Sequence, residues 1–310
     1  MQDLDRLKQK TAWLSIVSNT TLVVLKFIVG FYTGAMSLVS EAMHSGVDLL
    51  AALIAFWAVH KSVVPPDVEH DYGHGKYENI SSAVEAMLIV AAAIGIIYEA
   101  VQKFNGMEPP QFLGYGIAIM AVSIVINYFV SGRLMAVAKQ TGSQALEADG
   151  LHLRADIWTS VGVLGGLVGI ELTGWHWLDP AIAILVACII FHAGFGMVVE
   201  SAKELTDTSL PPEDEARIGA IFSRHREVLG YHCLRTRKSG SYKLLDVHIL
   251  FDAAMPLGRV HAICDEMEQQ IREAFGPFDV LIHAEPAGHT ETNALQYKKS
   301  HEAGRDSLVE

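Results

Sequence analysis

The sequence predicts an all-helical membrane bundle of six spans, followed by a small cytoplasmic α+β domain at the C-terminal end. Two observations carry this prediction. Hydrophobic residues make up 51% of the 310-residue chain and charged residues 19%, which is too apolar for an average soluble protein and too charged for one that lies wholly in a membrane. The apolar residues also gather in six runs, each long enough to cross about 30 Å of hydrocarbon.

The six apolar runs occupy residues 12–34, 37–60, 80–103, 112–136, 148–172 and 178–200. Basic side chains are concentrated in alternate connections. One side of the bundle has Arg6, Lys8, Lys10, Lys61, Lys76, Arg133, Lys139 and Lys203, and the loops of the other side offer Lys103. Because basic loops stay on the cytoplasmic side of a membrane, we expect both termini in the cytoplasm.

The character of the chain changes at Leu210, where Pro211 and Pro212 interrupt the helical pattern. The segments that follow are an amphipathic helix at about 213–222, strands at about 231–237 and 242–251, a helix at about 257–275 and a strand at 279–283. This order predicts a small α+β domain over 210–290 with helices on one face of its sheet. Residues 1–209 then form the membrane domain, and the polar segment 291–310 is expected to be a disordered tail.

Charge and cysteine content argue against a nucleic-acid partner, a disulfide framework and a cysteine zinc site. The net charge of −12 disfavours nucleic acid as a partner. The three cysteines, Cys188, Cys233 and Cys264, are an odd number at scattered spacing, which predicts neither a disulfide framework nor a Cys-x-x-Cys zinc site. Cys233 is expected to pack within the sheet, and a thiolate ligand beside His232 is the alternative.

Two predicted spans each carry a histidine and an aspartate four residues apart. His44 and Asp48 lie in the second span, and His152 and Asp156 lie near the start of the fifth. Residues at i and i+4 share one face of a helix, so two such faces opposed would offer two nitrogens and two oxygens, a tetrahedral set that suits zinc. Interhelical hydrogen bonding is the alternative explanation. The repetition on two spans favours a metal, because ionisable groups in a bilayer are costly without a partner or a role.

Other polar residues within the spans carry less weight as metal ligands. They are Asn19, Lys26, Glu85, Glu99, Asn127 and His192. We expect them to form hydrogen bonds between helices, with Lys26 and Glu99 able to reach toward the membrane interface.

Four features of the sequence, taken together, resemble the cation diffusion facilitator family over nearly the whole chain to about Pro286. They are SEAMHSGVD in the second span, DVEHDYGHGKYE in the next loop, EADGLHLRADIWTS in the fifth span and the histidine-bearing C-terminal domain. The sequence is most similar to the bacterial zinc and iron efflux branch. The resemblance implies a homodimeric exporter in the cell (inner) membrane, with six helices and a ferredoxin-like, metallochaperone-like cytoplasmic domain, that exchanges a divalent metal for protons.

The resemblance also assigns residues to sites. His44, Asp48, His152 and Asp156 match the family's transport site. Some bacterial relatives have aspartate where His44 stands, and the doubled His-Asp form is similar to that of zinc-selective members. Imidazole suits zinc better than it suits manganese or magnesium. Cadmium, cobalt, nickel, iron and manganese stay open as alternatives.

Further family sites lie outside the spans. The loop after the second span holds Asp67, His70 and His74, which match a second metal site; a solvated turn is the alternative. Lys76 and Asp207 match a charge pair that resembles the family's interlock at the dimer interface.

In the C-terminal domain the resemblance implies a dinuclear zinc site that regulates transport. Its matching residues are His232, His248, His261, His283 and Glu285, the last at a position where the family usually has aspartate. Strand alternation is expected to place His283 and Glu285 on one face and Asp246 with His248 on another. The alternative is a set of surface histidines on a stable fold.

Zinc binding requires neutral histidine and ionised aspartate, so protons and metal compete for the same side chains. This competition predicts a Zn²⁺/H⁺ antiporter driven by a pH gradient, and the sequence contains no Walker-type nucleotide loop. A metalloenzyme is the first rival, but no His-Glu-x-x-His motif occurs, and we expect no enzyme activity. The second rival is a membrane-anchored metal sensor, which would not need ionisable pairs on two spans.

Overall fold

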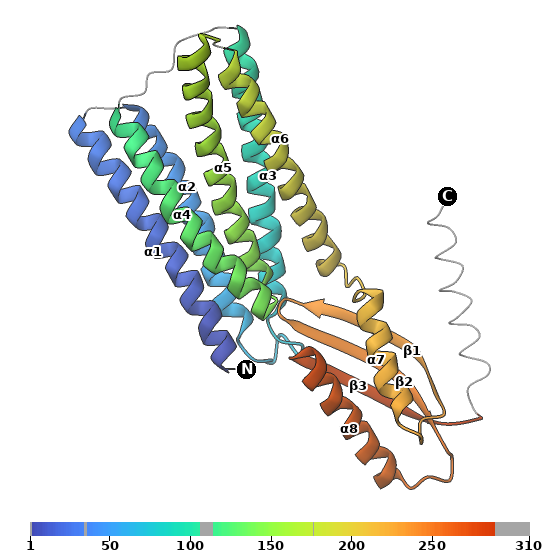
Figure 1. The fold of residues 1–310 in the computed structure, drawn as a ribbon. Coiled ribbons are helices and arrows are strands. Elements are labelled where there is room, and N and C mark those ends of the chain that lie inside the picture. The colour runs from blue at the N-terminus through green and yellow to red at the C-terminus, as the bar shows by residue number, and fades with distance from the viewer. Residues whose placement is uncertain (1, 34–35, 106–113, 176, 289–310) are drawn as a thin grey trace. The chain divides into compact units, whose positions relative to one another are not determined.

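The computed structural model describes residues 2–33, 36–105, 114–175 and 177–288. It divides into two compact units, Met1–Leu205 and Thr206–Glu310 (Figure 1). The predicted tail at 291–310 lies outside the described residues.

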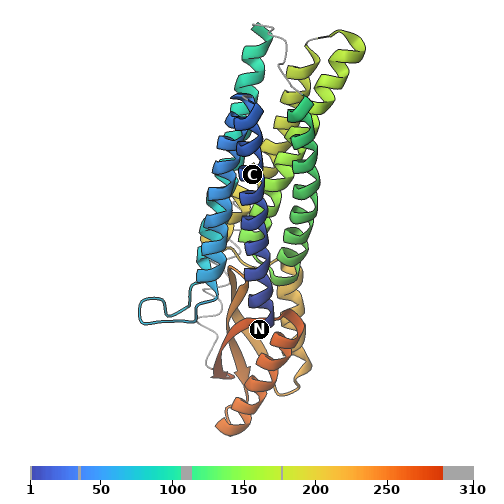
Figure 2. The ribbon, with the colours of Figure 1, turned by 90° about the vertical axis from the view of Figure 1, so that its left-hand side faces the viewer.

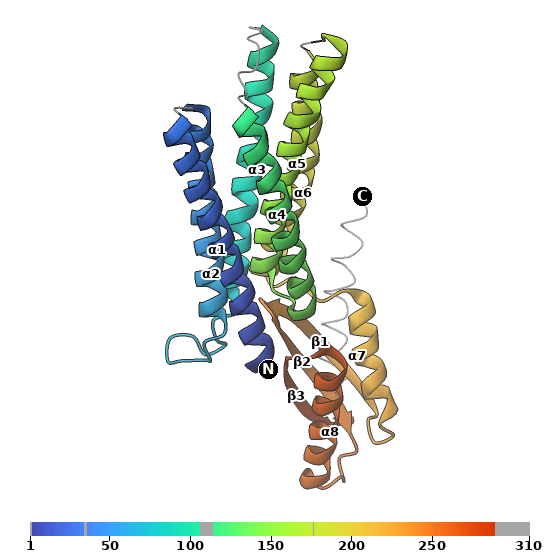
Figure 3. The ribbon, with the colours of Figure 1, turned by 60° about the vertical axis from the view of Figure 1, so that its left-hand side comes forward.

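The first unit consists of six long helices that run alongside one another (Figure 3). They are α1 (Gln2–Thr33), α2 (Met36–Ser62), α3 (Lys76–Asn105), α4 (Gly114–Thr141), α5 (Gln144–Thr173) and α6 (Leu178–Leu205). Within the described residues, α1, α3, α4 and α6 contain segments long and apolar enough to cross a membrane. Helices α2 and α5 carry the two His-Asp pairs, and α5 also opens with Glu147 and Asp149, so their apolar character is interrupted by charge.

Several helices continue beyond the apolar runs predicted from the sequence. Helix α3 begins at Lys76 and α5 at Gln144, each four residues before the predicted span. The loop between α2 and α3 projects from the end of the bundle at which α1 begins (Figure 2). The additional helical turns are polar, and they hold hydrogen bonds between neighbouring helices.

Adjacent residues at the start of α3 connect two groups of helices. Glu78 Oε1 accepts hydrogen bonds from Lys8 Nζ of α1 (3.0 Å) and Ser62 Oγ of α2 (2.7 Å). Asn79 Nδ2 donates to Gln144 Oε1 of α5 (2.8 Å) and Glu204 Oε2 of α6 (2.6 Å). All of these side chains are buried. A buried charge without a partner is strongly destabilising, so these contacts favour one relative placement of the helices.

Small residues allow close helix packing elsewhere in the bundle. A Cβ atom added at Gly150 of α5 would lie 2.9 Å from Met135 Sδ of α4, and one added at Gly194 of α6 would lie 2.9 Å from Ile89 Cγ2 of α3. Both distances are too short for real carbon contacts. Glycine at these two positions therefore lets the α4–α5 and α3–α6 pairs pack this closely.

The second unit is a three-stranded sheet covered on one face by two helices (Figure 1). Its elements are α7 (Pro212–Arg224), β1 (Gly230–Ser239), β2 (Tyr242–Phe251), α8 (Leu257–Phe275) and β3 (Phe278–Pro286). Strand β2 lies in the centre, antiparallel to β1 and parallel to β3. Helix α8 makes the crossover that a parallel pair requires. The predicted α+β fold is confirmed.

Alternation along β2 separates the covered face of the sheet from the open one. Leu245, Val247 and Ile249 are buried against α7 and α8. Asp246 and His248 are only partly buried. Since alternate side chains of a strand point to opposite faces, the open face is the one that presents ionisable groups.

The buried Lys8–Glu78 pair yields a stability prediction. Lys8→Met leaves the Glu78 carboxylate buried without its ammonium partner, so we expect the first unit to lose about 3–5 kcal/mol of stability. Thermal unfolding of the full chain in detergent would measure the change. The exposed Lys10→Met variant is the control, and the double variant Lys8→Met/Glu78→Gln should recover much of the loss. A double variant no more stable than Lys8→Met would contradict the pairing.

Candidate metal sites

Helices α2 and α5 bring three of the four predicted transport-site residues together. The ligand atoms of Asp48, His152 and Asp156 lie within 4.8 Å of one another. His152 Nε2 lies 3.1 Å from Asp48 Oδ1, and both side chains are buried. His44 lies on α2 one turn before Asp48, and its side chain is outside the described residues. The three described side chains supply one nitrogen and two carboxylates, a donor set that fits a divalent transition metal.

A cavity of about 180 Å³ adjoins this cluster between α1, α2, α4 and α5. Its polar lining consists of Asn19, Lys26, Ser45, Asp48, Ser123, Asn127, Asp156, Thr159 and Ser160. Lys26 Nζ donates a hydrogen bond to Ser45 Oγ at 2.8 Å. This bond between α1 and α2 is of the kind expected for Lys26, and it holds the ammonium at the cavity.

Two buried carboxyl groups lie near His152, and sequence reasoning did not assign either to a site. Glu85 of α3 and Asp149 of α5 are each 1% exposed. Neither Glu85 oxygen has a hydrogen-bond partner among the described residues, so the expectation that Glu85 bonds between helices is wrong. Glu85 interacts electrostatically with both Asp149 and His152. The spacing of Asp149 and His152, at i and i+3 on α5, was the available signal.

The loop between α2 and α3 brings Asp67, His70 and His74 within 4.8 Å of one another. Asp67 Oδ1 accepts hydrogen bonds from the backbone N–H of His70 (2.8 Å) and Glu69 (3.0 Å), and Oδ2 lies 3.3 Å from His74 Nε2. Partial burial would raise the pKa of Asp67, but these N–H groups and the His70 ring lower it below its usual value. The carboxylate is thus ionised, as metal binding requires.

His74 supports the same loop site by its burial. The residue is 3% exposed, and within the described structure Nδ1 has no hydrogen-bond partner.

The predicted interlock residues lie in different units. Lys76 begins α3 of the first unit, and Asp207 of the second unit accepts a hydrogen bond from Arg237 Nη1 at 3.2 Å. The pairing of Lys76 with Asp207 stays a prediction.

The register of the sheet aligns three histidines on its open face. His232 of β1 is paired with His248 of β2, which is paired with His283 of β3. Glu285 Oε1 lies 2.8 Å from His248 Nδ1, and Oε2 lies 3.1 Å from His232 Nε2. The prediction that His248 and Glu285 lie on different faces is wrong, because the parallel register of β2 and β3 places them on the same one.

A β-bulge adds Cys233 to this cluster. The register of β1 shifts between His232 and Arg235, and Cys233 has a φ of 51°. Its Sγ lies 3.2 Å from His232 Nδ1, so the thiol does not merely pack within the sheet. The ligand atoms form two overlapping groups, His232–Cys233–His248 and His248–His283–Glu285. His248 belongs to both groups, and nitrogen, oxygen and sulfur are the donor atoms that zinc takes.

Burial and neighbouring side chains shift the pKa values of two donors in this group of side chains, which we call the cytoplasmic cluster. Burial raises the pKa of the Cys233 thiol, and the Glu285 carboxylate raises it further. Burial would also raise the pKa of Glu285, but hydrogen bonds from His248 and His232 lower it overall. Glu285 is therefore an ionised carboxylate, and Cys233 is a protonated thiol.

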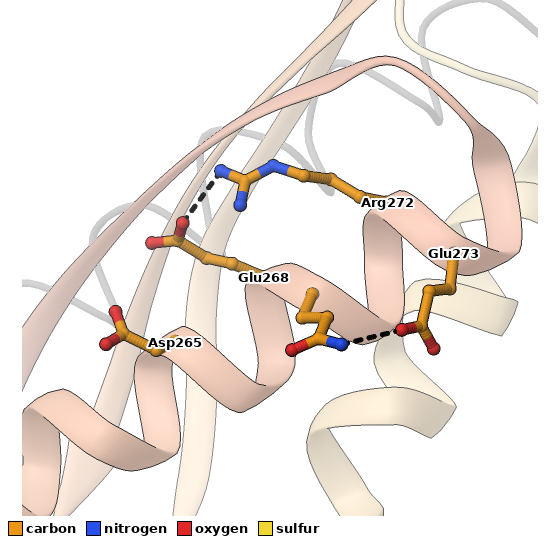
Figure 4. Close-up of a pocket in the computed structure, with 5 residues that line it drawn as sticks. Asp265, Glu268, Arg272 and Glu273 are labelled. Carbon is orange, nitrogen blue, oxygen red and sulfur yellow. Dashed lines mark hydrogen bonds and ion pairs between the residues drawn. The ribbon is translucent and has the colours of Figure 1, made fainter.

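His261, the fifth residue assigned to this site, lies apart from the others in this chain. It is on α8, with a side chain 74% exposed and Nε2 3.6 Å from Asp265 Oδ2. A nearby depression on α8 is lined by Asp265, Glu268, Gln269, Arg272 and Glu273 (Figure 4). Arg272 binds Glu268, and Gln269 binds Glu273, each at 2.8 Å along the helix. These pairings are typical of a solvated helix face.

Long apolar helices, with side chains able to bind a metal buried between them, define the class of multi-pass membrane proteins. Comparison with known families agrees with this class. Residues 12–206 match the cation efflux transmembrane domain, and residues 210–287 match the cytoplasmic domain of cation efflux proteins. The chain therefore belongs to the cation diffusion facilitator family and is a transmembrane cation efflux transporter of divalent metals.

Individual relatives cover nearly the full length of the chain. An uncharacterized transporter of Synechocystis sp. is 36% identical over 282 residues, which are 91% of each protein. The cation-efflux pump FieF of Klebsiella pneumoniae is 30% identical over 92% of this chain and 95% of its own. A solved structure of the metal-bound C-terminal domain of the CzcD transporter from Thermotoga maritima is 25% identical, covers 26% of this chain and 93% of that one, and has a TM-score of 0.25.

The cytoplasmic cluster yields a binding prediction. Glu285→Ala removes the carboxylate that contacts two imidazoles, so we expect zinc affinity at this cluster to fall by at least about tenfold. Calorimetry on the full chain would measure the loss, in an Asp48→Ala/Asp67→Ala background that leaves the cytoplasmic cluster as the assigned site. Glu273→Ala on α8 is the matched control. Equal affinity for the Glu285→Ala chain and its background would remove Glu285 from the ligand set.

Proposed function

We propose that this transporter exports Zn²⁺ from the cytoplasm in exchange for protons. The observation that carries the proposal is the contact of His152 Nε2 with Asp48 Oδ1 at 3.1 Å, with Asp156 in the same cluster. The metal would bind Asp48, His152 and Asp156, together with His44 from the preceding turn of α2. This set has the two imidazoles and two carboxylates of a tetrahedral zinc site.

The metal preference follows from the donor atoms. Imidazole nitrogen suits zinc, cobalt and nickel better than manganese or magnesium, which prefer sites made of oxygen alone. Cadmium, iron and the other divalent metals differ from zinc only in degree in how well these donor atoms suit them. Transport measured across zinc, cadmium, cobalt, nickel, iron and manganese would rank them. Zinc is the proposed substrate because each helix contributes one imidazole.

The same contact explains why protons would be exchanged. A His152 Nε2–H group that donates to Asp48 cannot at the same time offer the Nε2 lone pair to a metal. Metal binding therefore displaces this proton, and proton binding displaces the metal. Because a proton and the metal would bind the same nitrogen, a compartment more acidic than the cytoplasm favours release.

The orientation of the protein decides the direction of transport. From the basic residues in alternate connections we infer that both termini and the second unit lie in the cytoplasm. We place the six helices across the inner membrane, with the loop site of Asp67, His70 and His74 on the cytoplasmic side. A site there would hold metal close to the opening through which the transport site is loaded.

The cytoplasmic cluster would act as a zinc sensor in a homodimer. Its ligands are His232, His248, His283 and Glu285, with Cys233 beside them and His261 on α8. Zinc bound on the open face of the sheet would tighten the contact of two chains and bias the membrane domain toward transport. The Lys76–Asp207 pair would add a charge interlock at the same dimer.

A transport assay tests the main proposal. In proteoliposomes with an imposed pH gradient, Asp48→Ala and His152→Ala should each abolish zinc uptake, because each removes a ligand and a proton acceptor. His192→Ala on the exposed side of α6 is the control for loss of an imidazole within the membrane domain. Wild-type rates in both site variants would show that the transport site lies elsewhere, and uptake that persists without a pH gradient would remove the proton coupling.

A second measurement tests the sensor. His248→Ala removes the ligand that both groups of the cytoplasmic cluster share, so zinc-dependent tightening of the full-length dimer should be weakened while the transport site still binds metal. Fluorescence energy transfer between labelled cytoplasmic domains would report the tightening. An unchanged response to zinc would contradict the regulatory role.

A further inference from the structure

Cys233 lies on the open face of the sheet because of the bulge in β1. Strict alternation after His232 would turn the next side chain toward the covered face. The register shifts between His232 and Arg235, and Leu234 is the residue that packs against the buried core. Cys233 Sγ instead lies 3.2 Å from His232 Nδ1. A bulge can re-aim a side chain in this way, and here that side chain is a thiol.

The backbone at Cys233 is strained in this placement. Its φ of 51° lies in the left-handed region, which few residues other than glycine, asparagine, aspartate and histidine adopt. Glycine takes this conformation without a steric cost, so the shape of the bulge alone does not call for a cysteine. Strain of this kind persists where the surroundings fix it, and it is concentrated at functional sites.

Glu285 directs the lone pair of a neutral His232 toward the thiol. The pKa of Glu285 is lowered, so its carboxylate is ionised and only accepts hydrogen bonds. Glu285 Oε2 lies 3.1 Å from His232 Nε2, which therefore carries the proton. The other nitrogen, Nδ1, then has its lone pair free on the side of Sγ. A carboxylate holds the rear nitrogen of zinc-binding imidazoles in the same manner.

The spacing of sulfur and nitrogen fits one zinc ion. With a Zn–S bond of about 2.3 Å, a Zn–N bond of about 2.0 Å and tetrahedral geometry, the two ligand atoms lie about 3.5 Å apart. The 3.2 Å between Cys233 Sγ and His232 Nδ1 is close to this value. His248 supplies a third donor, because one ligand atom of each of the three residues lies within 4.8 Å of the others.

We propose that Cys233 is a thiolate ligand of the cytoplasmic cluster and gives the sensor a preference for thiophilic divalent metals, zinc and cadmium, over manganese. When the metal binds, a sulfur–metal bond forms and the thiol proton passes to solvent. Thiolate favours soft metals, whereas manganese prefers oxygen donors. The sensor thereby responds to a narrower set of metals than the transport site, whose proposed ligands are nitrogen and oxygen. This role rests on the proposed sensor function.

The experiment uses the full chain with Asp48→Ala and Asp67→Ala, so that the cytoplasmic cluster is the assigned site that remains. Cd²⁺ alone is the first probe, because a cadmium–thiolate bond gives a charge-transfer band in the ultraviolet. Cys233→Ser replaces sulfur by oxygen at nearly the same size. Cys233→Gly removes the side chain and relieves the backbone, so it separates a metal ligand from a residue that only shapes the bulge. Cys188→Ser, at an exposed position on α6, is the matched control.

The cadmium-loaded background chain and its Cys188→Ser variant should show the band, and both Cys233 variants should lack it. Loss of the ligand should also lower Zn²⁺ affinity by at least about tenfold, since even indirect partners of a metal contribute that much. Affinity for Mn²⁺ should change less, so the preference for Zn²⁺ over Mn²⁺ becomes smaller. Competition with a metal-sensitive dye would measure these affinities.

The outcomes separate the ligand from the sensor. Absence of the band in the background chain, its persistence in the Cys233 variants, or unchanged zinc affinity in a monodisperse Cys233→Gly chain overturns the ligand role of Cys233. The sensor still stands in that case if His248→Ala weakens zinc-dependent tightening of the dimer. If His248→Ala leaves the tightening intact, the sensor falls, while a band lost with Cys233 still identifies the thiolate as a metal ligand.

Discussion

Burying ionisable groups among membrane helices is costly unless packing brings them a partner, and the contact between His152 and Asp48 supplies one within the first unit. It joins α2 to α5, and the arrangement of the remaining helices supports it. Gly150 allows α4 to approach α5 closely, and Glu78 and Asn79 connect α3 to its neighbours. The helices thus build in advance the position at which the proposed exchange of a proton for a metal ion would take place.

The same energetic cost applies to the polar side chains between the start of α3 and the transport site. Lys8 and Glu78 form an ion pair. Glu85 and Asp149 bring acidic oxygens close to His152, but among the described residues both Glu85 oxygens and Asp149 Oδ2 have no hydrogen-bond partner. Lys26 adds a positive charge on the cavity side. The electrostatic field around Asp48 and His152 is therefore a balance of charges supplied by α1, α2, α3 and α5.

In the second unit, strand register brings the potential metal ligands together, as helix packing does in the first unit. Three histidines from three strands align because β1, β2 and β3 are paired at His232, His248 and His283. The bulge after His232 then turns Cys233 toward its neighbour. Both units thus join nitrogen and oxygen donors across elements distant in sequence, and the cytoplasmic one adds sulfur.

The sequence by itself determined the helical membrane domain, the α+β domain and the pairing of histidine with aspartate on two spans. These features depend on apolar length and on the 3.6-residue period, which are local properties of the chain. Only the tertiary structure decided that Lys26 faces the cavity, that Asp149 lies near Glu85, and that His248 and Glu285 share a face. Each of these depends on the rotation of one helix against another or on strand register and a bulge, which no single segment encodes.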